Sequence, residues 1–151
     1  MTTKDTNPKD AIAGDKLPMD LVPETLAIFT SLAMLEGALK YGKYNWRAAG
    51  VRASVYIGAI KRHLAKLNDG EWEDGKTGVP HAASIAASCA ILLDAHVVGK
   101  LHDDRPPSMD TSQLIDGLTQ RVIALKELFK DHHPHQHTIG DKVHGDSKKS
   151  V

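Results

Sequence analysis

Apolar residues recur along this chain at spacings of three and four positions, which is the period of an amphipathic α-helix. They predict four helices, over residues 23–40, 54–68, 80–98 and 111–130. Proline suits the first turn of a helix, which supports starts at Pro23 and Pro80, and Gly42 suits an end. No stretch of useful length alternates apolar and polar residues as a β-strand does. The sequence therefore predicts an all-α fold of the four-helix bundle type.

The third predicted helix, residues 80–98, is apolar on nearly all sides. Such a helix is expected at the centre of a bundle, with other helices around it. Its many alanines allow neighbouring helices to approach closely. In a domain of this size the remaining apolar faces indicate burial against a second subunit, so we expect a homo-oligomer, either a dimer or a tetramer.

The helical segments lie between two polar ends. A chain of 151 residues with 41% hydrophobic residues is long enough for one domain with its own core. Residues 1–22 contain few bulky apolar side chains and predict an extended N-terminal arm. Residues 131–151 are rich in His, Lys, Gly and Ser and predict a disordered tail. We therefore assign the all-α domain to residues 23–130.

Charge and composition argue against several classes of partner. Lys and Arg together number 19, as do Asp and Glu, so no net charge draws the protein to nucleic acid or to an anionic membrane. No apolar run approaches the roughly 18 residues of a membrane-spanning helix. A single cysteine, Cys89, and a polar start without an apolar signal core favour a reducing compartment. We expect a soluble cytoplasmic protein that binds neither polynucleotide nor membrane.

Candidate chemistry is concentrated between residues 36 and 81. Glu36 and Lys40 lie one helical turn apart, which by itself indicates only an intrahelical ion pair. The loop that follows adds Tyr41, Asn45 and Trp46, so that an amide and aromatic rings lie beside a cation and a carboxylate. Nucleotides require this mixture, because phosphates need positive charge and a base needs a flat surface or an amide.

The second predicted helix carries an adjacent arginine and histidine. Arg62 lies on a largely apolar helix and needs a partner for its charge, which a phosphate or an acidic side chain could supply. His63 alone would more often be a packed core residue than a ligand. His81, at the start of the third helix, is a further candidate site residue.

The loop between these helices is acidic. Residues 69–74 hold four carboxylates in six positions, which repel one another unless water or a divalent cation neutralises them. Solvation is the simpler explanation. The spacing excludes a calcium loop of the EF-hand type, whereas Mg²⁺ or Mn²⁺ fits, because these ions accept one or two carboxylates together with water and phosphate oxygens.

A set of short motifs follows in order along residues 7–98. They are Lys9-Asp10, Gly14-Asp15-Lys16, Ala38-Leu39-Lys40-Tyr41-Gly42, Asn45-Trp46, Arg62-His63-Leu64, Gly70-Glu71 with Asp74, and Gly78 with His81. As an ordered set they resemble a family of bacteriophage dATP/dGTP diphosphohydrolases, which is itself similar to the all-α MazG-like nucleotide pyrophosphohydrolases.

The resemblance implies an activity and a cofactor. A helical oligomer of this kind cleaves a purine deoxynucleoside triphosphate, dGTP or dATP, between its α and β phosphates with Mg²⁺ or Mn²⁺, and releases the monophosphate and pyrophosphate. Some similar enzymes supply dGMP for phage DNA that contains 2-aminoadenine, and this chain could be such a dGTP-specific member, acting in the host cytoplasm.

The resemblance also suggests roles for individual residues. We expect Glu36, His63 and Glu71 to be catalytic, with Glu36, Glu71 and Asp74 as metal ligands. We expect substrate to be bound by Lys16, Lys40, Tyr41, Asn45, Trp46, Arg62 and His81.

Two alternatives remain on sequence grounds. The first is a non-catalytic helical scaffold or nucleotide-binding protein whose acidic loop is merely solvated. The second is a triphosphohydrolase of the His-Asp type, suggested weakly by His102-Asp103, which would release tripolyphosphate. The histidines of residues 132–137 suit adventitious chelation of transition metals, and we expect no catalytic role for them.

Overall fold

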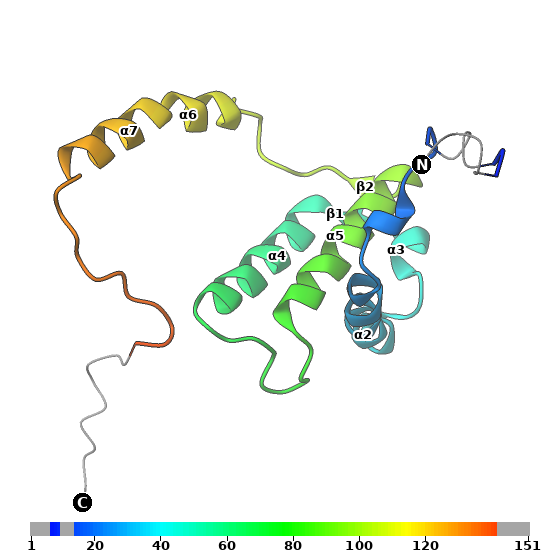
Figure 1. The fold of residues 1–151 in the computed structure, drawn as a ribbon. Coiled ribbons are helices and arrows are strands. Elements are labelled where there is room, and N and C mark those ends of the chain that lie inside the picture. The colour runs from blue at the N-terminus through cyan, green and yellow to red at the C-terminus, as the bar shows by residue number, and fades with distance from the viewer. Residues whose placement is uncertain (1–6, 10–13, 142–151) are drawn as a thin grey trace, which may run out of the picture. The chain divides into compact units, whose positions relative to one another are not determined.

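A computed structural model of the protein describes residues 7–9 and 14–141. It divides into two units, one ending at Asp104 and one beginning at Arg105 (Figure 1). The first unit contains the 3-10 helix η1 (Met19–Leu21), the helices α2 (Glu24–Tyr41), α3 (Asn45–Ala48), α4 (Ala53–Asn68) and α5 (His81–Val97), and the strands β1 (Val51–Arg52) and β2 (Leu101–His102). The second unit contains α6 (Thr111–Gly117) and α7 (Thr119–Leu128). The predicted all-α class is confirmed.

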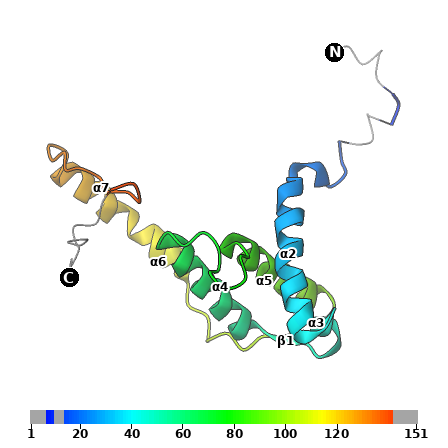
Figure 2. The same ribbon diagram turned by 90° about the horizontal axis from the view of Figure 1, so that it is seen from below.

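The first unit is built on α5. Helices α4 and α5 lie side by side as an antiparallel hairpin, and α2 packs against α5 from another direction (Figures 1 and 2). The predicted central position of the third helix is therefore confirmed. Strand β1 leads into α4 and strand β2 follows α5, and they pair in parallel with Val51 opposite Leu101. This short pair closes the end of the hairpin that lies away from the acidic loop.

Small side chains form the core between α2 and α5. The buried cluster consists of Ala33, Val79, Ala83 and Ala87, with Met34 packed against it. Alanine contributes little apolar area, but it lets two helix backbones approach closely, so Ala33 and Ala87 set the separation of α2 from α5. A narrow interface of this kind brings the polar side chains beside it within reach of one another.

Asp104 caps α4 from a distant part of the chain. The N-cap residue of α4, Arg52, provides no capping side chain. Instead Asp104 Oδ1 accepts a hydrogen bond from the Ser54 backbone N–H at 2.8 Å, and Oδ2 accepts one from the Ser54 hydroxyl at 2.6 Å. These bonds lower the pKa of Asp104. The negative charge at the positive end of the helix dipole ties the chain after β2 to the start of α4.

The fourth predicted helix is two helices. Asp110 caps α6 as expected, because its side chain accepts a hydrogen bond from the Gln113 N–H at 2.8 Å. The helix then breaks at Leu118, directly after Gly117. Glycine has low helix propensity because of its conformational freedom, which explains a break that the apolar spacing alone did not predict.

Parts of the predicted arm and tail, namely residues 1–6, 10–13 and 142–151, lie outside the described residues. Of the residues that are described, none belongs to a helix with the length and apolar character needed to cross a bilayer.

We predict that Gly50→Ala lowers the free energy of unfolding of the first unit by about 1–2 kcal/mol, the cost of a left-handed backbone for a residue with a Cβ. Gly50 has φ +80°, and an added Cβ would lie 2.9 Å from the backbone oxygen of Lys100. The matched control is Gly75→Ala, because a Cβ at Gly75 meets no atom within 4 Å. Chemical denaturation measures both. Equal stability of the two variants would contradict this account of the β1–β2 junction.

Candidate active site

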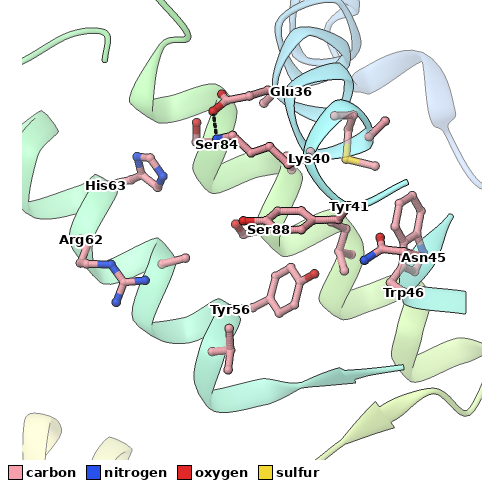
Figure 3. Close-up of a pocket in the computed structure, with 18 residues that line it drawn as sticks. Glu36, Lys40, Tyr41, Asn45, Trp46, Tyr56, Arg62, His63, Ser84 and Ser88 are labelled. Carbon is pink, nitrogen blue, oxygen red and sulfur yellow. Dashed lines mark hydrogen bonds and ion pairs between the residues drawn. The ribbon is translucent and has the colours of Figure 1, made fainter. Parts of the chain in front are cut away.

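A cavity of about 500 Å³ opens where α2, α3, α4 and α5 meet (Figure 3). Its size is typical of sites for small molecules. Among the residues that line it are seven of those predicted to act in the site: Glu36, Lys40, Tyr41, Asn45, Trp46, Arg62 and His63. These residues come from three separate helices, so the fold brings together groups that the sequence disperses.

Helix α2 contributes a carboxylate and a cation. Glu36 and Lys40 form the predicted ion pair within the helix (Figure 3). The hydrogen bond from Lys40 to Glu36 raises the pKa of the Lys40 amine, so that this side chain stays charged. Tyr41 follows directly, and Gly42, with φ +90°, ends the helix as predicted and turns the chain toward α3.

Helix α4 contributes a second wall. Tyr56 and His63 are two helical turns apart and therefore share one face, which carries both side chains to the cavity. Burial raises the pKa of the Tyr56 phenol, so that it stays protonated and can donate a hydrogen bond. Arg62 folds back along α4, and its Nη1 atom would lie 3.3 Å from a Cβ at Gly58. The absence of a side chain at Gly58 leaves space for the guanidinium group.

Helix α5 begins with a fully buried histidine. The exposed fraction of His81 is 0%. Its Nδ1 atom lies 2.9 Å from Nδ1 of His63, and its Nε2 atom lies 3.0 Å from Oε1 of Glu71. This second contact lacks the alignment of an ordinary hydrogen bond. Glu71, His81 and His63 thus connect the acidic loop to the cavity through the core.

The tautomers of His81 and His63 follow from the contacts of their ring nitrogens. We assign the hydrogen of His81 to Nε2, which lies 3.0 Å from the Glu71 carboxylate, because a carboxylate accepts hydrogen bonds and does not donate them. A neutral His81 then has a lone pair on Nδ1, and His63 must donate its Nδ1 hydrogen to it. This arrangement leaves the Nε2 atom of His63 with a free lone pair.

The surroundings of His63 keep its ring electrically neutral at neutral pH. Burial lowers its pKa, and the neighbouring His81 and Lys66 lower it further. The negative charges of Asp74 and Glu36 act in the opposite direction. Since both carboxylates affect one ring, α2 and the acidic loop both approach His63.

Backbone hydrogen bonds hold the acidic loop against the start of α5. The His81 N–H donates to the Trp72 carbonyl at 3.0 Å, and the Asp74 N–H donates to the Val79 carbonyl at 3.0 Å. Asp74 also stabilises the turn that follows it, because its Oδ1 atom accepts hydrogen bonds from the backbone N–H groups of Lys76 and Thr77. These bonds are the main reason that the pKa of Asp74 is lowered. One oxygen of this predicted metal ligand therefore has a structural role.

Each predicted metal ligand has a lysine beside it. Glu36 pairs with Lys40, and Lys66 Nζ lies 3.4 Å from Glu71 and 3.7 Å from Asp74. The His81 contact and Lys66 lower the pKa of Glu71. Because the carboxylates are already neutralised by ammonium groups, a metal ion would have to displace or join these lysines.

The end of the cavity formed by α3 is held by an aspartate on α5. Asp94 accepts hydrogen bonds from Trp46 Nε1 at 2.6 Å and from Arg47 Nε and Nη2 at 2.8 Å and 2.7 Å. These bonds lower the pKa of Asp94 to about 2. Asp94 is thus separate from the His81 group. Because its N–H is committed to Asp94, Trp46 can offer a ligand only its ring.

Some predicted residues lie outside the cavity, and some residues that line it were not predicted. Lys16 is exposed and does not line the cavity, and neither does His102 on β2. Ser84 and Ser88 do line it, although no role was assigned to them (Figure 3). They lie one and two turns beyond His81 on its face of the helix, which is the signal that could have identified them. Tyr56 likewise lies on the same face of α4 as His63, two turns before it.

The spacing of potential ligand atoms shows where a metal ion could be held. Within the described residues, only His135, His137 and Asp141 bring three histidine, cysteine or carboxylate ligand atoms within 4.8 Å of one another. Glu36, Glu71 and Asp74 do not reach this spacing, and their role as ligands stays a prediction. Their chemistry does fit a hard divalent cation, because carboxylate oxygens are the ligands that Mg²⁺ and Mn²⁺ prefer.

Comparison with known proteins shows which family the chain resembles. A family model described as dATP/dGTP diphosphohydrolase, N-terminal, matches residues 6–105. A dATP/dGTP diphosphohydrolase of Salmonella phage PMBT28 is 28% identical over 95 residues, which cover 63% of this chain and 30% of that protein. This chain therefore spans less than a third of the length of that relative. No solved structure matches the chain, so the likeness to MazG-type enzymes stays a prediction.

We predict that His63 is the Nδ1–H tautomer and His81 the Nε2–H tautomer at pH 7.5. Long-range ¹⁵N–¹H correlation spectra of the two imidazole rings measure this directly, with His63→Ala and His81→Ala used for assignment. A hydrogen on Nε2 of His63 would contradict this assignment of hydrogens, because the lone pair of His63 would then point to His81 and not to the cavity.

Proposed function

The chain belongs to the dATP/dGTP diphosphohydrolase N-terminal family, and on this premise we propose that the cavity binds a purine deoxynucleoside triphosphate and hydrolyses it to the monophosphate and pyrophosphate. One observation carries the proposal: a single cavity is lined by cationic, aromatic and amide side chains beside a neutral histidine and a carboxylate. A nucleotide needs the first three kinds of group, and hydrolysis needs the last two.

The base binds at the end of the cavity that α3 forms. The Trp46 ring, held by Asp94, provides a surface for stacking, and Tyr44 packs against that ring with centroids 5.5 Å apart. The Asn45 amide can donate to and accept from the edge of a base. Since Trp46 is fixed before the nucleotide arrives, little conformational entropy is lost when the base stacks on it.

The phosphates bind between α2 and α4. Lys40 and Arg62 line the cavity from these two helices. Arginine suits a phosphate because its guanidinium group donates two parallel hydrogen bonds, and the lysine adds a compact charge. A triphosphate would compete with Glu36 for Lys40, so that binding of substrate frees the Glu36 carboxylate.

Hydrolysis requires a positioned water and neutralisation of the leaving pyrophosphate. His63 accepts the proton of the water on its Nε2 lone pair, and Glu71 stabilises the positive charge that then develops across the two imidazole rings. Mg²⁺ or Mn²⁺ held by Glu36, Glu71 and Asp74 would neutralise the leaving group and lower the pKa of the water. Asn45 would contact the edge of the base, where dGTP and dATP differ, and hydrolysis of dGTP would supply dGMP for DNA that contains 2-aminoadenine.

A non-catalytic nucleotide sensor is the second candidate. The pairing of all three carboxylates with Lys40 and Lys66 favours it, because such a site binds phosphates without needing a metal. Incubation with each deoxynucleoside triphosphate and Mg²⁺ or Mn²⁺, followed by chromatography, separates the candidates. Monophosphate with pyrophosphate supports hydrolysis, tripolyphosphate indicates the His-Asp type of enzyme, and binding without product indicates the sensor.

We predict that Glu71→Gln lowers kcat by about 100-fold or more, the usual contribution of general acid–base catalysis. The neutral amide no longer balances the charge that develops on His81 and His63. The matched control is Glu73→Gln in the same loop, because it is Glu71, and not Glu73, that contacts His81 and Lys66. Far-ultraviolet circular dichroism checks that both variants keep their helices. Full activity of Glu71→Gln would remove this residue from the mechanism.

We also propose that the chain self-associates through α2. Four apolar residues, Ile28, Leu32, Leu35 and Leu39, follow one another at spacings of four, three and four, so they share one stripe within about 60° of the helix surface. Their exposed fractions are 64%, 45%, 51% and 79%. The opposite face packs on α5 through Ala33 and Met34.

This stripe suits a second copy of the same helix. An apolar stripe with a four-three-four repeat is the seam of a helix pair, and large exposed apolar patches mark interfaces. Pairing with the same helix in another copy buries the stripe on both chains and forms a symmetric interface. The partner is thus a second copy of this chain.

We predict that Leu35→Lys dissociates the oligomer into monomers at micromolar concentration, because a charge would be buried at the centre of the seam. Sedimentation velocity measures the species present. The matched control is Leu64→Lys on α4, where the leucine is exposed but outside the stripe. A monomeric wild-type chain, or equal dissociation by the two variants, would contradict association through α2.

A further inference from the structure

Three potential metal ligands come together in the second unit, after α7. His135 Nε2 lies 3.2 Å from Asp141 Oδ1, and His137 Nδ1 lies 3.6 Å from Asp141 Oδ2. The ligand atoms all lie within 4.8 Å of one another. The ligands of a tetrahedral zinc ion are about 3.4 Å apart, because the metal–ligand bonds are about 2.0–2.1 Å long. Only small side-chain rotations separate the observed spacing from that of a metal site.

A tight turn holds the carboxylate in place. The Asp141 N–H donates to the Thr138 carbonyl at 2.9 Å, and Asp141 Oδ2 accepts a hydrogen bond from the Thr138 backbone N–H. The Gly140 N–H donates to the Thr138 hydroxyl at 3.4 Å. Such bonds to a ligand orient it before the metal arrives, as the outer partners of known metal ligands do.

The segment that carries the histidines is anchored to the end of α7. The His132 N–H donates to the Phe129 carbonyl at 3.0 Å, and the two rings pack edge to face with centroids 5.4 Å apart. Pro134 and Gln136 line a hollow together with Leu125 of α7. The rings of His135 and His137 are 4.5 Å apart. These contacts distinguish the group from histidines that merely occur close together in the sequence.

The ligand chemistry selects the class of ion. Two imidazoles suit zinc, nickel, copper and similar transition metals, whereas Mg²⁺ and Ca²⁺ prefer oxygen ligands. Two histidines and one carboxylate leave at least one coordination position for water. The side chains of His135 and His137 are 66% and 76% exposed, so an ion reaches them directly from solvent.

We propose that His135, His137 and Asp141 form a binding site for one transition-metal ion of the Zn²⁺ class. The site is separate from the carboxylates at the cavity in both its residues and its preferred ion. Its occupation fixes the turn of residues 138–141 to the histidine segment. The proposal holds whether or not the first unit hydrolyses nucleotides.

Titration of the full chain with ZnCl₂ by calorimetry tests the site. We expect Asp141→Ala and His137→Ala each to lower the Zn²⁺ affinity about tenfold or more, since both remove a ligand and even outer partners contribute tenfold. The matched controls are Asp131→Ala and His133→Ala, which change the same residue types in the same segment. We expect them to retain the wild-type affinity within about twofold.

A second measurement guards against variants that alter the turn itself. Asp141→Asn keeps the size of the side chain and its ability to accept from Thr138, and circular dichroism confirms the helices. With Co²⁺ in place of Zn²⁺, we expect the visible absorption of tetrahedral cobalt in the wild type and its loss in Asp141→Asn. Wild-type affinity in Asp141→Ala, or equal losses in His133→Ala and His137→Ala, would overturn the proposal in favour of unspecific chelation by histidines.

Discussion

The first unit depends on the burial of one polar ring. His81 has no exposed surface, and a buried imidazole without partners costs folding free energy. Its two nitrogens face His63 on α4 and Glu71 in the acidic loop. The need to satisfy this ring therefore fixes the register of α4 against α5 and draws the loop onto the start of α5. The alanine core between α2 and α5 is close enough to place Glu36 beside the same histidine pair.

The charged groups around this pair lie in ion pairs with one another. Lys40 pairs with Glu36, Lys66 is shared by Glu71 and Asp74, and Asp94 pairs with Arg47 at the other end of the cavity. A triphosphate in the cavity brings several negative charges and would compete with Glu36 for Lys40. The Glu36 carboxylate would then be free to bind a cation, so substrate and metal would favour each other's binding.

The helices and several cavity-lining residues were predictable because they depend on local sequence. The apolar period located α2, α4 and α5, and the mixture of charge, amide and ring drew attention to Lys40, Asn45 and Trp46, which line the cavity. Contacts between distant positions were not predictable: the sequence does not show that Asp94 commits the Trp46 N–H or that Asp104 caps α4. The break at Leu118 was missed because apolar spacing does not report the weakness of a glycine within a helix.

The central claim is that the groups around His63 form one nucleotide site. Crystallographic structure determination of the full chain with Mn²⁺ and a non-hydrolysable dGTP analogue tests it most directly, because the anomalous signal of manganese locates the ion. The account predicts phosphates between Lys40 and Arg62, the base on Trp46, and manganese next to Glu36 and Glu71. A nucleotide bound elsewhere, with the Glu36–Lys40 pair intact and no manganese at these carboxylates, would contradict it.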